Sequence, residues 1–477
     1  MNSLAMKKDI GFEVLPKEYS KRLSGCASGD IVAQKDRRFL LLKFPELNEK
    51  EMHMYASALE EMKRSSARID KKADVYFFLK SHCLENLILL NKSQREKFLE
   101  LLEWESLGES VLTPLLADPD FEEIVINGAN RPIMVYHVSF GWLETNARFT
   151  SEEKIRNVIN KMASPLGRQL SFHTPLLNAV LKSGSRLNAS MNPIAFSGIN
   201  ATIRKFKENP LTPVDIVKGG TISGEAMAFL WLAMQTSCSI LVCGNTGSGK
   251  TTTLNALFCF LPKDERIVVA EETPELLLPQ SHTVKMNTAE QLNIGLGALI
   301  ENTFRMRPDR VVVGEIRSPE EAKAFVNTML AGQAKGSYGT FHAESAEEAL
   351  ERLVSFGIEE RALASLDLIL VQKRLGRIGK RGGSRREERK VVELCEISKE
   401  KGKLELRKLF DFCHEKGRLE KRGESERAMR KIMRTFSIGA KEAKKLLREK
   451  ETLLEKLEGA TFREFFELAE QESCGER

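Results

Sequence analysis

A glycine-rich stretch near the middle of the chain constrains the fold more than any other feature. The apolar run 240–243 predicts a buried strand, and residues 251–260 predict a helix. Between them, Gly244 to Thr251 follow the G-x-x-x-x-G-K-[ST] spacing of a phosphate-binding loop. Glycines let backbone N–H groups point inward around phosphates, and the helix N-terminus adds its positive dipole end. A glycine-rich surface turn with a chance lysine is the alternative, but it would not require the flanking strand and helix.

The residue types of the loop predict what each part of it binds. We expect Lys250 to bridge the β- and γ-phosphates and the Thr251 hydroxyl to ligate Mg²⁺, so ATP and Mg²⁺ are the expected cofactors. The residues expected to hold the nucleotide through this loop are Gly244, Asn245, Thr246, Gly247, Ser248, Gly249, Lys250, Thr251 and Thr252.

Composition excludes several classes of protein. Hydrophobic residues make up 42% and charged residues 29% of the 477 positions, which is typical of a globular chain of about three domains. The net charge of +6 does not indicate a nucleic-acid binder. The eight cysteines include no C-x-x-C pair, so no zinc ribbon or redox motif is predicted. The N-terminus lacks an apolar export core, and no apolar stretch reaches the roughly 20 residues of a membrane helix. We expect a cytoplasmic protein with no membrane span of its own.

Changes of pattern along the chain predict five segments. They are a helical or mixed extension (1–108), a small α+β domain (109–206), a linker (207–223), an α/β nucleotide domain (224–376), and a basic loop with a largely helical C-terminal region (377–477). The extension is either an adaptor for a partner or a layer packed on the next domain. The basic loop is either a solvated loop or a contact for an acidic surface. Within the two terminal segments, the runs 40–44 and 391–397 are strand candidates.

The nucleotide domain alternates apolar runs with helical stretches, which predicts a parallel sheet covered on both faces. The strand candidates are 240–243, 267–271, 283–286, 311–315, 338–342 and 368–371. Ligands of such sheets bind at the carboxyl ends of the strands.

Acidic residues stand at two of these strand ends. Glu315 follows an apolar run, and Glu271 and Glu272 close another. An acid beside a phosphate loop serves the metal and the attacking water, and two acids can divide these duties. Gly314 stands where many such enzymes carry a metal-facing aspartate, so Glu315 is expected to serve the water, the hydration shell of the metal, or both. Either acidic cluster could instead be a helix-capping turn. His342, at another strand end, is either structural or a sensor of the γ-phosphate or of a subunit boundary.

Several motifs together resemble the secretion ATPases of type II and type IV systems, with the tight-adherence and archaeal pilus or archaellum branch the most similar. They are the phosphate loop, residues 299–317, the run 336–343, and the motifs 115–120, 125–128, 184–188 and 202–206. The resemblance covers roughly 115–371. It implies an α/β, RecA-like P-loop domain preceded by a smaller α+β domain, with helical extensions at both ends, in a hexameric ring.

The resemblance also implies roles for single residues. Glu271 and Glu272 match an acidic box whose second member is usually aspartate, and Glu315 matches the glutamate of the second phosphate-site motif. His342 matches the later histidine of a histidine box, whose earlier histidine is missing near 333–335. Arg186 and Arg204 match arginines that can reach nucleotide phosphates. We therefore list Glu315, Glu271, Glu272, His342 and Arg186 as candidate catalytic residues and Arg204 as a candidate nucleotide contact.

The predicted function is that of an ATP-hydrolysing homohexameric motor for a pilus-like or archaellum-like filament. The motor would act on a polytopic membrane platform protein from the inner face of the cell membrane. One alternative is a conjugation-type motor that exports DNA or protein. Another is a RecA-like nucleic-acid translocase, but that function needs a basic, aromatic-lined channel, and aromatic residues make up only 7% of the chain. Nucleic acid is therefore not an expected partner.

Overall fold

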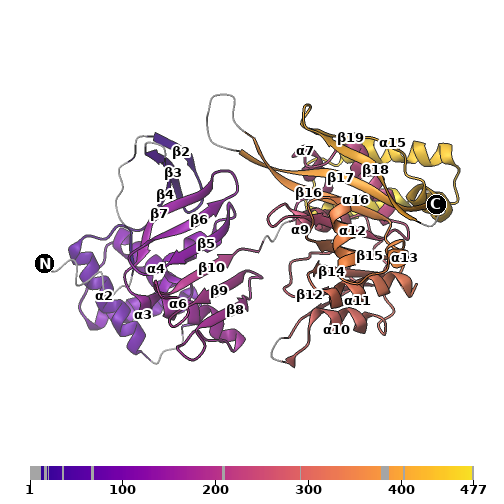
Figure 1. Cartoon of the computed structure of the whole chain (residues 1–477). Helices are drawn as coiled ribbons and strands as arrows, with labels where there is room; N and C mark the ends of the chain where they lie inside the picture. Colours follow the sequence, from indigo (N-terminus) through magenta and orange to yellow (C-terminus); the bar gives the residue numbers. More distant parts are fainter. Residues whose placement is uncertain are drawn as a thin grey trace. The chain divides into compact units, whose positions relative to one another are not determined.

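The computed structural model describes residues 12–14, 19, 21–34, 37–65, 69–206, 210–289, 292–332, 334–377, 386–400 and 403–474. The chain divides into two compact units, Met1–Lys207 and Glu208–Arg477 (Figure 1). Parts of the expected linker (207–209), of the region of the missing histidine (333) and of the basic loop (378–385) lie outside the described residues. Among the helices of the described ranges, none combines the length and the apolar character needed to cross a membrane.

The first unit is built on a ten-stranded sheet of order β2-β3-β4-β7-β6-β5-β10-β9-β8, with β1 paired to β7. All neighbours are antiparallel except β4 and β7, which are parallel. The strands are β1 (Phe12–Val14), β2 (Lys21–Gly25), β3 (Gly29–Gln34), β4 (Arg37–Leu42), β5 (Phe121–Asn127), β6 (Pro132–His137), β7 (Gly141–Phe149), β8 (Leu176–Val180), β9 (Arg186–Ser190) and β10 (Asn200–Arg204).

Helices pack on this sheet and share its core. They are α2 (Glu49–Arg64), α3 (Lys72–Glu85), α4 (Lys92–Ser106), α5 (Thr113–Ala117) and α6 (Glu152–Ala163), with 3₁₀ turns η1 (Ser110–Leu112) and η2 (Ser164–Leu166). Asn48 and Asn91 begin α2 and α4 with capping boxes, which satisfy N–H groups that a helix end leaves unpaired. Ile31 of β3 lies in the same buried cluster as Ile124 of β5. The expected extension therefore contributes strands as well as helices, and it shares one sheet and one core with the expected α+β domain.

The second unit is built on a nine-stranded sheet of order β13-β12-β14-β15-β11-β16-β17-β18-β19. The strands from β13 to β16 in this order are parallel, and β16 to β19 are antiparallel. All six strand candidates of the nucleotide domain are confirmed. The strands are β11 (Ile240–Gly244), β12 (Ile267–Glu271), β13 (Thr283–Asn287), β14 (Arg310–Ile316), β15 (Gly336–Phe341), β16 (Leu368–Arg377), β17 (Arg386–Glu400), β18 (Lys403–Cys413) and β19 (Arg418–Lys421).

Helices cover both faces of the parallel strands, as continuous apolar strands require. Val242 and Val312 point into one buried cluster, whereas the adjacent Leu241 and Val313 point into another. The first cluster includes residues of α7 (Pro213–Lys218), α8 (Gly224–Met234), α9 (Lys250–Phe258), α14 (Arg427–Phe436), α15 (Ala440–Lys456) and α16 (Phe462–Cys474). The second includes residues of α10 (Leu296–Thr303), α11 (Pro319–Leu330), α12 (Ala346–Ser355) and α13 (Glu360–Leu363). The expected fold class is confirmed: an α/β, RecA-like phosphate-loop domain follows a smaller α+β domain.

The sequence predicts one strand, at 391–397, after the basic loop, and the structure has three antiparallel strands there, β17, β18 and β19, which widen the sheet beyond β16 (Figure 1). β17 is paired along both of its edges, so backbone hydrogen bonds support it where its sequence is charged. The helices after it complete the core. The ring of Phe465 from α16 lies 6.1 Å from that of Trp231, and Lys450 Nζ lies 5.0 Å from the Trp231 ring centroid. Trp231 itself is fully buried.

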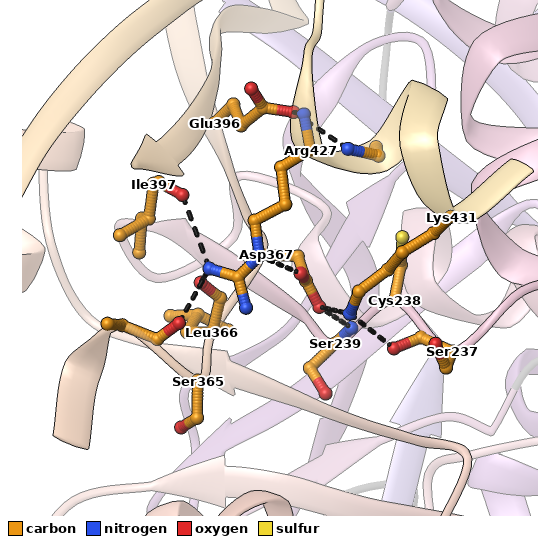
Figure 2. Close-up of polar contacts among 12 residues, drawn as sticks. Ser237, Cys238, Ser239, Ser365, Leu366, Asp367, Glu396, Ile397, Arg427 and Lys431 are labelled. Atoms are coloured by element: carbon orange, nitrogen blue, oxygen red, sulfur yellow. Dashed lines mark hydrogen bonds and ion pairs between the residues drawn. The ribbon is translucent and has the colours of Figure 1, made fainter. Parts of the chain in front are cut away.

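The buried carboxylates of Asp367 and Glu396 bind helix α14 to the sheet, near the amino ends of β11 and β16 (Figure 2). Asp367, directly before β16, accepts hydrogen bonds from the Ser239 N–H and from Lys431 Nζ, both at 2.8 Å. It also forms an ion pair with Arg427 Nε at 2.7 Å. Glu396 of β17 accepts the backbone N–H groups of Arg427 and Ala428 at 3.0 and 2.9 Å, which caps the N-terminus of α14.

Candidate nucleotide-binding site

The loop between β11 and α9 has the shape of a phosphate cradle. Gly244 has φ 150° and Gly249, the N-cap of α9, has φ 96°, conformations that glycine adopts without steric cost. A Cβ on Gly244 would lie 2.1 Å from the carbonyl oxygen of Gln372, so β16 leaves no room for a side chain there. Because Gly244 and Gly249 carry no side chains, the backbone N–H groups of the loop can approach a ligand directly.

Polar groups inside the loop fit a phosphate. Lys250 is only 7% exposed, and its Nζ donates to the carbonyl oxygens of Gly244 at 2.8 Å and Asn245 at 3.2 Å. The Ser248 hydroxyl is buried and has no hydrogen-bond partner among the described residues. A buried donor without a partner is costly, so this hydroxyl and the ammonium of Lys250 suit an anion bound in the loop.

The Thr251 hydroxyl, at the start of α9, and the Glu275 carboxylate, from the segment after β12, fit a magnesium ion. The Thr251 hydroxyl donates to Glu275 Oε2 at 3.3 Å. Hydroxyl and carboxylate oxygens are the ligands that Mg²⁺ prefers. Thr251 is the predicted ligand, and the structure adds Glu275 as its neighbour.

Glu315 lies at the centre of a cluster of charged side chains. His342 Nε2 lies 3.0 Å from Glu315 Oε1, Arg317 Nε donates to Glu315 Oε2 at 2.9 Å, and Lys250 Nζ lies 4.0 Å from Oε1. The pairing of β14 with β15 shifts register between Val313 and Ile316, and such a bulge can re-aim a side chain. Burial alone would raise the pKa of Glu315, but Arg317, Lys250 and His342 outweigh it and hold the pKa below its ordinary value. Glu315 is therefore an ionised carboxylate at neutral pH.

His342, directly after β15, is a neutral partner of that carboxylate. Burial, and then the charge of Lys250, lower its pKa, and this outweighs the opposite effect of Glu315. A neutral imidazole has one N–H, which can donate to Glu315. His342 therefore lies where it can orient Glu315 without adding charge.

The two members of the acidic box lie in different surroundings. Glu272 forms an ion pair with Arg317, which joins it to the Glu315 cluster. Glu271 is buried, and its Oε1 accepts the backbone N–H groups of Glu275 and Leu276, both at 3.0 Å. Burial raises the pKa of Glu271 to about 7. The Glu271 carboxyl thus holds the segment that carries Glu275, while Glu272 faces the charged cluster.

A model of the family described as type II/IV secretion system protein matches residues 105–459. This match spans both structural units and most of the chain. The chain belongs to the type II/IV secretion system protein family.

Individual relatives of this family match over shorter stretches. An uncharacterized protein of Methanocaldococcus jannaschii is 39% identical over 216 residues, which cover 43% of this chain and 30% of the relative. A second uncharacterized protein of that organism is 34% identical and is covered over 49% of its length, so the chain spans half or less of these two relatives. The type IV secretion system protein VirB11 of Bartonella henselae is 29% identical over 51% of this chain and 78% of its own.

Among solved structures, the VirB11 ATPase of the Brucella suis type IV secretion system, in complex with sulphate, is 25% identical to this chain. It is matched over 59% of this chain and 91% of its own, with a TM-score of 0.31.

The two arginines that the family resemblance singled out are cross-strand neighbours in the first unit. Arg186 begins β9 and Arg204 ends β10, and the two residues are directly paired. Directly opposite residues of an antiparallel pair project from the same face of a sheet. Their predicted contacts with nucleotide phosphates stay predictions.

Several residues near the loop were not among the candidate site residues of the sequence, among them Arg317, Glu275 and Gln372. Arg317 links Glu315 to Glu272. Glu275 accepts the Thr251 hydroxyl, and Gln372 Oε1 accepts the hydroxyl of Thr253 at 2.7 Å. Arg317 lies two residues after Glu315, and Glu275 lies four residues after Glu271. This closeness in sequence to a predicted site residue could have marked both as members of the site. Gln372 lies more than a hundred residues from the loop in an apolar strand, and no local pattern marks it.

Proposed function

We propose that this type II/IV secretion system protein is an ATP-hydrolysing motor. One observation carries the proposal: Lys250 of the phosphate loop lies 4.0 Å from Glu315, which His342 contacts at 3.0 Å. A lysine that binds phosphates thus lies beside an ionised carboxylate suited to act as general base. Phosphoryl transfer to water requires this pairing of positioning and base.

Each residue of the site has its own role in the proposed hydrolysis of ATP. Lys250 and the N–H groups of the loop bind the phosphates, and Thr251 with Glu275 would hold Mg²⁺, which neutralises phosphate charge when bound. Glu315 orients a water molecule and takes its proton, while His342 and Arg317 position Glu315. Glu271 acts through the segment 272–276, which it anchors.

We place the motor at the inner face of the cell membrane, in the cytoplasm, as a homohexamer that drives a pilus-like or archaellum-like filament through a polytopic platform protein. The motifs shared with the tight-adherence and archaeal branch support this assignment. Arg186 and Arg204 stay predicted phosphate contacts on the strength of the same resemblance.

Export of DNA or protein is the second candidate function. It is favoured by a relative from Mycobacterium tuberculosis, named as a putative conjugal transfer protein, which is 29% identical over 64% of this chain and 89% of its own. Deleting the gene in its own host separates the two candidates. Loss of surface filaments with intact DNA and protein export supports the filament motor, and the reverse outcome supports the export motor.

ATP turnover by the purified protein tests the enzyme assignment. Lys250→Ala should abolish turnover, because it removes the charge that bridges the phosphates. Glu315→Gln should still bind ATP with Mg²⁺ but turn it over at least about a hundredfold more slowly, the usual range for loss of a general base. Steady-state ATPase assays measure the turnover rate of each variant, and binding of labelled ATP measures whether it still binds the nucleotide.

Two outcomes would change the assignment. Turnover by Lys250→Ala at the rate of the unaltered protein would exclude the phosphate loop as the site. A Glu272→Gln variant far slower than Glu315→Gln would exchange the roles of these two acids.

A further inference from the structure

Two arginines of the paired strands β16 and β17 lie against the phosphate loop. Arg389 Nε donates to the carbonyl oxygen of Gly247 at 3.2 Å. An added Cβ on Gly249 would lie 3.3 Å from Arg389 Cδ, and one on Gly247 would lie 3.4 Å from an Arg374 guanidinium nitrogen. Both guanidinium groups are therefore within reach of a ligand held by this loop.

The two arginines are held close together despite their like charge. Arg374 and Arg389 are direct partners in the β16–β17 pairing, so their side chains share a face of the paired strands. Like charges directly opposite one another destabilise a strand pair. Arg374 forms an ion pair with Glu387, and Arg389 donates to the carbonyl oxygen of Gly247. The pairing of the two strands therefore holds two guanidinium groups side by side next to the loop.

The order of the strands tells which end of a nucleotide these arginines would meet. The loop strand β11 lies between β15 and β16. Glu315 and His342, the residues for γ-phosphate chemistry, lie on β14 and directly after β15, on one side of β11. Arg374 and Arg389 lie on β16 and β17, on its other side. A triphosphate whose γ end faces Glu315 must extend its α-phosphate and ribose toward the arginine side.

We propose that Arg374 and Arg389 form a subsite for the α-phosphate end of the nucleotide. This inference rests on the proposed ATPase function and deepens it. A guanidinium presents several N–H donors in a fixed plane, which suits phosphate oxygens. Because the α-phosphate is present in both ATP and ADP, the subsite binds substrate and product alike and does not select for the γ-phosphate.

Binding of fluorescently labelled ADP to the full chain, with unlabelled ATP and ADP as competitors, tests the subsite. Arg389→Ala, Arg389→Gln and Arg374→Ala should each raise the Kd for ATP and for ADP about tenfold, the usual effect of losing one hydrogen bond to a charged group. In turnover assays these three variants should raise KM and leave kcat nearly unchanged. Lys373→Ala is the matched control, because it removes the same charge from the opposite face of the same strand. Its Kd should stay within about twofold of the unaltered protein.

The glutamine variant separates phosphate binding from support of the loop. Glutamine can still donate a hydrogen bond to Gly247 but has no charge. If Arg389→Gln bound ADP like the unaltered protein, Arg389 would only brace the loop and the subsite would be excluded. A loss of ATP binding with unchanged ADP binding would also exclude it. If Arg389→Ala does not fold, Arg389→Gln and Arg374→Ala decide the question. Failure of the unaltered protein to bind ADP would instead overturn the proposed ATPase function.

Discussion

At the scale of single residues, Glu271 and Glu315 show how surroundings separate two identical side chains. Both stand at or near the carboxyl ends of adjacent parallel strands, β12 and β14. Arg317, Lys250 and His342 hold the pKa of Glu315 low, whereas burial raises the pKa of Glu271 to about 7. A Cβ on Gly314 would lie 3.0 Å from Glu271 Cγ, so this glycine makes room for the buried carboxyl.

The pKa of Glu271 predicts a pH-dependent gain in stability for Glu271→Gln. The folded pKa lies above the ordinary value of 4.5, so the folded chain holds its proton longer than the unfolded chain. Stability is therefore lost as the pH rises from 4.5 to about 7, by up to about 3 kcal/mol. The amide oxygen of glutamine can still accept the N–H groups of Glu275 and Leu276 but never ionises.

Urea unfolding at pH 5 and pH 8 measures this effect. The stability of Glu271→Gln relative to the unaltered protein should rise between these two values. Glu301→Gln, on the exposed side of α10, is the control and should show no such rise. A pH-independent difference for Glu271→Gln would mean that Glu271 does not hold a proton in the folded chain.

At the scale of elements, α14 is fastened to the sheet by charges rather than by apolar contacts alone. Asp367 is fully buried, and Lys431 and Arg427 converge on it from one helix (Figure 2). Glu396 from β17 caps that helix. The antiparallel strands and the C-terminal helices are thereby joined to the parallel strand β16, and we expect them to unfold together with it.

Asp367→Ala should lower the free energy of unfolding by about 3 kcal/mol, because it leaves Lys431 and Arg427 without their buried counter-ion. Chemical denaturation of the full chain measures the loss. Glu359→Ala removes the acid of an exposed ion pair with Arg361 and should cost less than about 1 kcal/mol. Equal losses in the two variants would show that the Asp367 cluster adds no more than a surface pair.

At the scale of the whole molecule, the arginines Arg186, Arg204, Arg305, Arg307 and Arg317 are more than one triphosphate can use. The structure pairs Arg317 with Glu315 and Glu272 of its own chain. A phosphate-contacting arginine supplied by a neighbouring subunit can raise the rate about 10³-fold or more. This is the reason for expecting a cooperative ring.

ATPase activity per chain is therefore expected to rise steeply with protein concentration as hexamers form. Mixing Lys250→Ala chains into the unaltered protein should depress activity more than simple dilution, because inactive subunits interrupt the ring. Rates measured across the assembly range, with mass determined by light scattering, test both expectations. Flat activity per chain together with linear dilution would show that each subunit works alone.

The sequence by itself determined the features that depend on local spacing. The phosphate loop, the six parallel strands and the α/β class followed from short patterns, because glycine positions and apolar runs act within a few residues. The candidates Lys250, Glu315, Glu272 and His342 were predicted for the same reason: Lys250 stands in the phosphate-loop motif, and the other three stand in motifs at strand ends.

Only the tertiary structure decided features that depend on pairing between distant segments. Strands β1, β2, β3, β18 and β19 were not among the strand candidates of the sequence, and they form because neighbouring strands satisfy their backbone groups. Glu271 differs from Glu272 because Gly314, on another strand, admits its side chain into the interior. Arg389 and Gln372 reach the phosphate loop because β16 pairs with β11 and β17 pairs with β16. No short sequence pattern can predict such proximity, because it arises only when strands from distant parts of the chain pair in the sheet.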